Sequence, residues 1–150
     1  MSRLYYEDDY DYWQEGLQRG WLRSAIRGKR GQQFLRELVL ALDALPTPEL
    51  SCGALEDSKT GCCCAFGAVR RFRGPENIKL WFHPEEEDMT PDNLAEPFGV
   101  SPTLAWAVVQ ANDEDMNDGN TEQSRRRRWA EVRAWAVRHL LPVPQQRADG

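Results

Sequence analysis

Cysteine is the residue type whose spacing in this chain first suggests metal or covalent chemistry. Cys62, Cys63 and Cys64 are consecutive, and Cys52 lies a short distance before them. A zinc site usually takes cysteines spaced by about two to four residues, so that both thiolates reach one tetrahedral ion. Adjacent cysteines point in different directions, so the pattern favours packing as small apolar side chains. We expect no metal site and no cofactor.

A cysteine nucleophile also needs a general base, and the histidines of the chain are His83 and His139. Nothing in the sequence positions either of them beside Cys64. The glycines follow none of the spacings that hold nucleotide phosphates, and the carboxylates form no recognisable catalytic frame. The sequence therefore predicts a protein that is not an enzyme.

The acidic stretch 112–120 looks at first like a calcium-binding loop. With Asp113 as the first ligand, Asp115 falls at the third position. The pattern then fails, because Asp118 stands where the turn glycine belongs and Ser124 where a bidentate acid belongs. We interpret the stretch as a solvated loop whose acids favour the N-terminus of the following helix.

Residues 91–111 have the outline of a helix-turn-helix motif with a turn around Gly99. A recognition helix needs cations or amides at its N-terminal end to meet phosphates and base edges. The second helix here carries no arginine or lysine, and acids follow it directly. The sequence favours core packing for this helix, with DNA reading as the alternative.

Charge is sorted into basic and acidic blocks, although the net charge of -5 is modest and argues against general DNA binding. Clustered arginines can hold phosphates bidentately. The consecutive arginines 125–128, however, would point around a helix, and acidic blocks of similar size are available to pair with the basic ones. The pattern favours ion pairing or solvated faces over nucleic-acid binding. The charged residues that we expect at a partner interface are Arg27, Lys29, Arg30, Arg125, Arg126, Arg127, Arg128, Glu85, Glu86, Glu87, Asp113, Glu114 and Asp115.

The elements that must position these residues are mostly helices. Apolar residues at three- and four-residue steps predict helices over about 10–28 and about 31–45, with a break between them. Small and apolar residues predict a short helix over 65–72. Capping residues predict helices beginning near Pro91, near Pro102 and after Thr121, and prolines end the last helix near Leu141.

Two β-like runs, 50–55 and 61–64, flank a polar turn at 56–60 and predict a small hairpin. The expected fold is therefore mainly α, a compact bundle of about five helices with one small β-hairpin. The length of 150 residues fits a single globular domain over 1–150, with flexible ends at 1–9 and 143–150.

The sequence shows no sign of a membrane or secretory segment. No apolar run approaches the ~18 residues that a membrane span needs. The N-terminus turns acidic at once and has no basic start followed by an apolar core, unlike a signal peptide. We expect a cytoplasmic protein with reduced cysteines and no membrane contact.

Several short motifs recur in an order that is more specific than any one of them. They are 24–32, 34–38, 64–68, Phe98-Gly99-Val100, Asn112-Asp113-Glu114 and the arginine-tryptophan helix that contains Arg128-Trp129, Arg133 and Trp135. In this order the chain resembles a group of small uncharacterised proteins encoded by tailed bacteriophages and prophages. The resemblance covers most of residues 13–141, and no active site or ligand comes with it.

The resemblance implies a non-enzymatic phage accessory protein in the host cytoplasm that binds a host protein. Targets of such proteins include components of antiviral defence, so an inhibitor of the anti-CRISPR kind is one expectation. The alternative is a nucleic-acid-binding regulator that uses the basic blocks or the element resembling a helix-turn-helix. The oligomeric state is left open.

Overall fold

The computed structural model describes residues 19–86, 90–113 and 120–143. Residues 19–27 are helical and are followed by α2 (Lys29–Asp43), α3 (Ala65–Arg73), a 3-10 turn (Pro75–Asn77), α4 (Pro91–Phe98), α5 (Pro102–Asp113) and α6 (Glu122–Arg138). An antiparallel pair joins β1 (Glu56–Asp57) to β2 (Cys62–Cys63). The predicted fold class, mainly helical with a minor hairpin, is confirmed.

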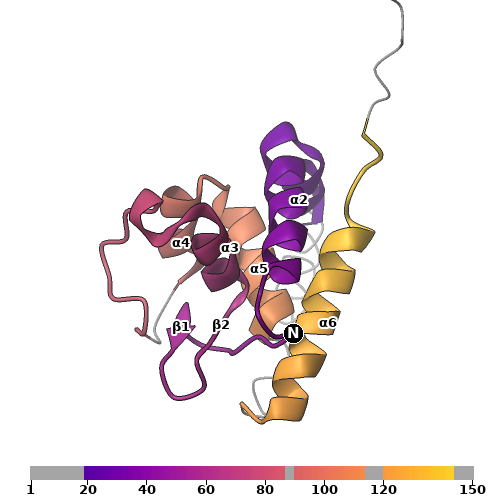
Figure 1. Cartoon of the computed structure of the whole chain (residues 1–150). Helices are drawn as coiled ribbons and strands as arrows, with labels where there is room; N and C mark the ends of the chain where they lie inside the picture. The colour runs from indigo at the N-terminus through magenta and orange to yellow at the C-terminus, as the bar shows by residue number, and fades with distance from the viewer. Residues whose placement is uncertain (1–18, 87–89, 114–119, 144–150) are drawn as a thin grey trace, which may run out of the picture.

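The helices pack in pairs around α2 and α5. α2 contacts α3 on one side and α6 on the other, while α5 contacts α4 and α6. Figure 1 shows α6 running alongside α2, with the hairpin below α3. The predicted ends lie outside the described residues except for residue 143, and so do residues 10–18 of the predicted first helix.

Capping side chains place the helix starts where the sequence predicts them. The Thr90 hydroxyl accepts a hydrogen bond from the backbone N–H of Asn93, and the Thr121 hydroxyl accepts one from Ser124. Ser101 does the same for Leu104, at 3.1 Å. Each of these bonds satisfies an N–H that has no partner inside its own helix. The last helix ends at Arg138, a few residues before the predicted Leu141.

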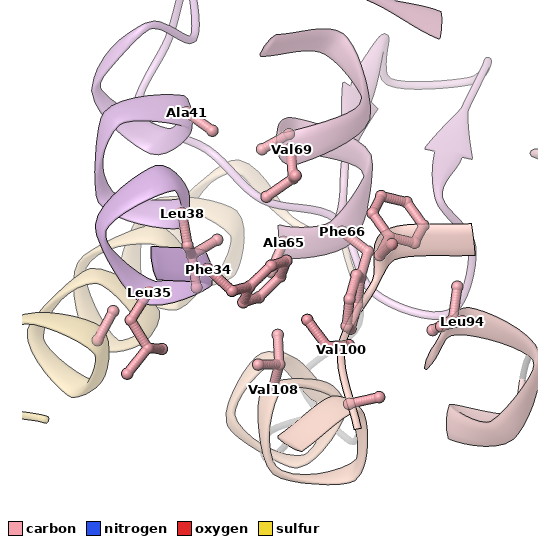
Figure 2. Close-up of a cluster of buried hydrophobic side chains, with 14 of the residues drawn as sticks. Phe34, Leu35, Leu38, Ala41, Ala65, Phe66, Val69, Leu94, Val100 and Val108 are labelled. Atoms are coloured by element: carbon pink, nitrogen blue, oxygen red, sulfur yellow. The ribbon is translucent and has the colours of Figure 1, made fainter. Parts of the chain in front are cut away.

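The core lies between α2, α3 and α5, as Figure 2 shows. The predicted stripe of α2 is buried, with Leu35 and Leu38 at 0% exposure. The ring of Phe66 in α3 contacts two other rings. Its centroid lies 5.5 Å from that of Phe34 and 4.9 Å from that of Phe98. Full burial of a side chain of this size contributes about 2–3 kcal/mol.

The hairpin exists, but the prediction for its first strand is wrong. β1 occupies Glu56–Asp57, which we expected to form the turn, and Leu50 and Leu55 are buried in the core instead. Long-range contacts explain the shift. The backbone N–H of Glu56 donates to the carbonyl of Pro84 at 3.0 Å, and its carboxylate receives hydrogen bonds from Arg71.

Candidate protein-binding groove

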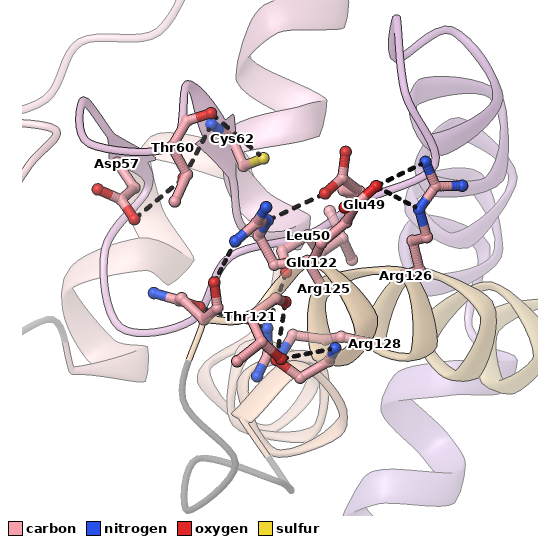
Figure 3. Close-up of polar contacts among 12 residues, drawn as sticks. Glu49, Leu50, Asp57, Thr60, Cys62, Thr121, Glu122, Arg125, Arg126 and Arg128 are labelled. Carbon is pink, nitrogen blue, oxygen red and sulfur yellow. Dashed lines mark hydrogen bonds and ion pairs between the residues drawn. The ribbon is translucent and has the colours of Figure 1, made fainter.

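The arginines 125–128 separate into paired and buried side chains. Figure 3 shows the polar contacts of Arg125, Arg126 and Arg128. Arg125 is partly buried, and its Nε lies 3.0 Å from Oε1 of Glu49. Arg126 is exposed and pairs with Glu122 at 3.1 Å, one turn earlier in α6. Arg127 lies 4.0 Å from Glu131. These pairs support the interpretation that the basic block at 125–128 is matched at least in part by acids within the fold.

Arg128 is one of the residues that we expected at a partner interface, and the structure places it in the interior instead. It is 3% exposed, and its Nη1 donates to the carbonyl of Leu50 at 2.8 Å. The backbone N–H of Leu50 donates in return to the carbonyl of Arg125 at 3.0 Å. Arg128 shares the buried face of α6 with Ser124 and Val132, its neighbours at four-residue spacing. That spacing was the signal in the sequence that could have identified it as a core residue.

Most of the acidic residues that we expected as counterparts, at 7–15, 85–88 and 113–118, lie outside the described residues. Arginines in the described part of the chain pair with Glu37, Asp43, Glu49, Glu56, Glu122 and Glu131. Glu85 and Glu86 are exposed in the segment before α4. Asp113 ends α5 and accepts a hydrogen bond from Nδ2 of Asn112. Glu87, Glu114 and Asp115 lie outside the described residues, as does most of the acidic stretch.

Arg27, Lys29 and Arg30 are exposed, as predicted, where the helix 19–27 meets α2. None of the three forms an ion pair within the described residues. Lys29 and Arg30 stand in the first turn of α2, where the helix dipole disfavours cations, and Gly28 provides no side-chain cap. The junction is therefore a positive surface that the described part of the fold does not neutralise.

Cys63 and Cys64 lie in surroundings that favour the neutral thiol. Burial raises the pKa of Cys63 well above its usual range and that of Cys64 to about 12. Sγ of Cys64 caps α3 and accepts the N–H of Gly67 at 3.5 Å. His83 and His139 each use Nδ1 in a local contact with nearby backbone. Because nucleophilic cysteines react as thiolates, Cys64 is poorly placed for that chemistry.

An open groove, partly apolar, lies between the helix 19–27, α5 and α6, and we call it the tryptophan groove. It has a volume of about 660 Å³ and is lined by Leu22, Trp106, Ala107, Gln110, Ala111, Glu131, Ala134, Trp135 and Arg138. A hollow of about 280 Å³, lined by Trp21, Leu22, Thr103 and Trp106, adjoins it. Trp21 is 58% and Trp106 is 48% exposed.

The core packing that the sequence favours for α5 is found, but Trp106 lies outside the core. α5 buries Leu104 and Val108, which are four residues apart. Trp106 lies two residues from each, about 200° around the helix, and therefore faces away from the core. The sequence offers α5 as either a recognition helix or a core helix, and neither interpretation includes an exposed apolar face on it.

Gln32 fixes the helices that form the groove walls relative to one another. Its Nε2 donates to the carbonyls of Ile26 and His139, at 2.8 and 3.0 Å. Its Oε1 accepts from the backbone N–H of Leu141 at 2.8 Å. The side chain is 4% exposed, so these bonds are shielded from water. One amide thus joins the end of the helix 19–27 to the segment that ends α6.

Positive charge borders the groove. Arg19, Arg23 and Arg27 recur at four-residue steps along the helix 19–27 and, with Arg138 of α6, line a neighbouring hollow of about 530 Å³. Leu22 and Arg138 line both this hollow and the tryptophan groove. Arg23, Arg27 and Arg138 form no ion pair within the described residues.

Two other exposed apolar sites lie elsewhere on the molecule. Leu40 of α2 and Phe72 of α3 line a hollow of about 720 Å³ together with arginines. Trp81, in the segment between the 3-10 turn and α4, is 70% exposed and contacts Phe82 edge to face. Trp81 lines none of the hollows that form the tryptophan groove, so it is a natural control residue for it.

Metal sites and membrane spans are not found in the part of the chain that the structure describes. No group of three or more His, Cys, Asp or Glu side chains there could hold a metal ion. No helix within the same residues has the length and apolar character to cross a membrane. Comparison with known proteins gives no relative: no family model, no curated protein and no solved structure matches the chain.

Proposed function

We propose that the chain is a non-enzymatic accessory protein of a tailed bacteriophage that acts in the host cytoplasm by binding a host protein. Its target class includes components of antiviral defence such as CRISPR complexes. The phage context rests on the order of the sequence motifs. The binding activity rests on the tryptophan groove.

The observation that carries the binding activity is the exposure of Trp21 and Trp106 beside an alanine-lined floor. Tryptophan is among the residues most often found at the energetic centre of protein interfaces. Exposed apolar patches on soluble domains mark interaction sites, because leaving them in water is unfavourable. A groove of this composition is suited to receive apolar side chains from another protein.

The nucleic-acid alternative has its own observation, the exposed cations Arg27, Lys29 and Arg30. Phosphates would neutralise them and release counterions, so the affinity would fall steeply with salt. This surface adjoins the tryptophan groove without lining its floor. The two functions can therefore be separated by substitutions.

The test is a pull-down from bacterial lysates that have been treated with nuclease, at moderate salt. The baits are the wild-type chain, Trp106→Ala and the matched control Trp81→Ala. We expect one stoichiometric host protein on the wild type and on Trp81→Ala, reduced at least tenfold on Trp106→Ala, since loss of a central tryptophan costs about 2 kcal/mol or more. Circular dichroism checks that both variants are folded.

Retention of the same protein by all three baits would show that the groove is not the contact surface. Recovery of nucleic acid alone, lost with the triple variant Arg27→Glu, Lys29→Glu, Arg30→Glu, would establish the alternative. Recovery of neither would overturn both functions.

A further inference from the structure

We infer that the occupant of the tryptophan groove is an acidic amphipathic α-helix of the partner protein, bound with its apolar face on Leu22, Trp106 and Trp135. The inference rests on the proposed function and specifies the chemistry of the partner. It follows from the shape of the groove and from the charge on its border.

The floor of the groove allows another helix to approach closely. Ala107 and Ala111 are four residues apart on α5, and Ala134 lies on α6. Residues four apart share one face of a helix, so the two alanines form a low strip between the larger side chains. Small residues at such positions let a neighbouring helix pack at the usual separation of about 8–10 Å. The tryptophans then stand as walls beside it.

The walls provide separate places for apolar side chains. Trp106 lines both the main groove, which has a volume of about 660 Å³, and the adjoining hollow, which has a volume of about 280 Å³. A bound helix places apolar residues at positions i, i+3, i+4 and i+7, which is the pattern that helix-in-groove recognition uses. The divided hollow matches side chains from successive turns of one helix.

The small size of the sheet makes it unsuitable for binding a partner as an added strand. Strand addition depends on a sheet edge with several unpaired main-chain groups. The strands in the described part of the chain have two residues each, β1 and β2. An edge of that length provides too few hydrogen bonds to hold a peptide, so recognition falls to the helical surfaces.

The border of the groove selects an acidic partner. Arg23, Arg27 and Arg138 are exposed and lack ion pairs within the described residues. The acid that lines the groove, Glu131, already lies 4.0 Å from Arg127. Carboxylates on the polar face of a bound helix would therefore meet cations that have no acidic partner among the described residues, whereas lysines would be repelled.

The direct test uses synthetic peptides of about 20 residues, long enough to form a helix in the groove. The first has leucine at positions i, i+3, i+4 and i+7 with glutamate on the remaining face. The second replaces every glutamate by lysine. The third has the composition of the first in an order without helical periodicity. Binding of each labelled peptide to the full chain is measured by fluorescence anisotropy at low and moderate salt.

We expect the acidic amphipathic peptide to bind at least tenfold more tightly than the lysine peptide and the scrambled peptide. Trp106→Ala should weaken it by about 30-fold, as for a central hot-spot tryptophan. Trp81→Ala should leave it unchanged. The double variant Arg23→Glu, Arg138→Glu should abolish the preference for the acidic over the lysine peptide.

Several outcomes would overturn the inference. Equal affinity for the acidic and lysine peptides would mean that the groove binds apolar side chains without selecting charge. Equal affinity for the acidic and scrambled peptides would mean that binding depends on charge and not on helical periodicity. Tighter binding of a single-stranded oligonucleotide, lost in Trp106→Ala, would assign the indoles to base stacking. A dimer in sedimentation analysis that dissociates on the same substitution would assign the groove to a second copy of this chain.

The two proposals fail in different ways. If a lysate protein is captured through Trp106 but the acidic peptide does not bind, the proposed function stands and the partner class is wrong. If the acidic peptide binds selectively and no lysate protein is captured, the recognition chemistry stands and the proposed host-binding function fails.

Discussion

The side-chain oxygen of Asn112, in the last turn of α5, accepts a hydrogen bond of 2.9 Å from the backbone N–H of Ala65, the first residue of α3. The Nδ2 group of Asn112 donates to the carbonyl of Ser51 at 3.1 Å. The side chain is 4% exposed. A residue that opens the acidic stretch in the sequence therefore links three parts of the core.

Replacing Asn112 by alanine should lower the free energy of unfolding by about 2–3 kcal/mol, because two buried backbone groups lose their partner. Urea denaturation measures the change. Gln110→Ala, an exposed position on the same helix, serves as the control and should change stability by less than about 0.5 kcal/mol. Similar losses for the two variants would contradict the linking role of Asn112.

Arg128→Ala should destabilise the protein by about 3 kcal/mol, whereas Arg126→Ala should cost less than about 0.5 kcal/mol. The first substitution removes a buried donor to the carbonyl of Leu50, and the second removes an exposed pair with Glu122. Thermal and urea unfolding of the two variants provides the comparison. Equal stability would mean that Arg128 is not part of the core.

Gly31→Ala and Gly20→Ala should have opposite effects on stability. A Cβ at Gly31 would collide with the backbone carbonyl of Ala25, so the end of the helix 19–27 would have to move from α2. A Cβ at Gly20 meets nothing within 4 Å, and alanine there favours the helix by about 0.5–1 kcal/mol. Melting temperatures should fall for the first and rise slightly for the second. A neutral Gly31→Ala would contradict the close contact.

Stability should decline in alkaline solution through the buried thiols. Burial raises the pKa of Cys63 in the folded state above its unfolded value of about 8.5, so the folded state retains a proton that the unfolded state loses. This contribution is complete below about pH 8.5 and falls by about 1.4 kcal/mol per pH unit above it. Cys63→Ala should flatten the decline of the urea midpoint between about pH 9 and 11. An unchanged slope would show that this thiol does not titrate differently in the two states.

Local sequence signals predicted the helices well because those signals act within a few residues. The hydroxyls of Thr90 and Thr121 and the proline at Pro91 act within the first turn of their own helices. The apolar spacing of α2 likewise depends on helical geometry alone. Such features need no knowledge of the rest of the chain.

The groove and the first strand were missed because their causes lie far away in the sequence. β1 forms at Glu56 because Arg71 and Pro84 hold that residue. Trp106 is exposed because α5 turns Leu104 and Val108 towards the core, so its outward face depends on where α3 and α4 pack. Arg27 was identified among the positive residues, yet its position in a hollow next to the tryptophan groove required the fold.

The hydrogen bonds of Gln32 also set an order of events during synthesis. Gln32 and His139 are 107 residues apart, so one of the acceptors that holds the helix 19–27 is synthesised 107 residues after Gln32. At about 5–20 residues per second, this interval lasts about 5–20 seconds. The tryptophan groove, which α6 helps to line, therefore cannot be complete on a nascent chain before α6 has left the ribosome.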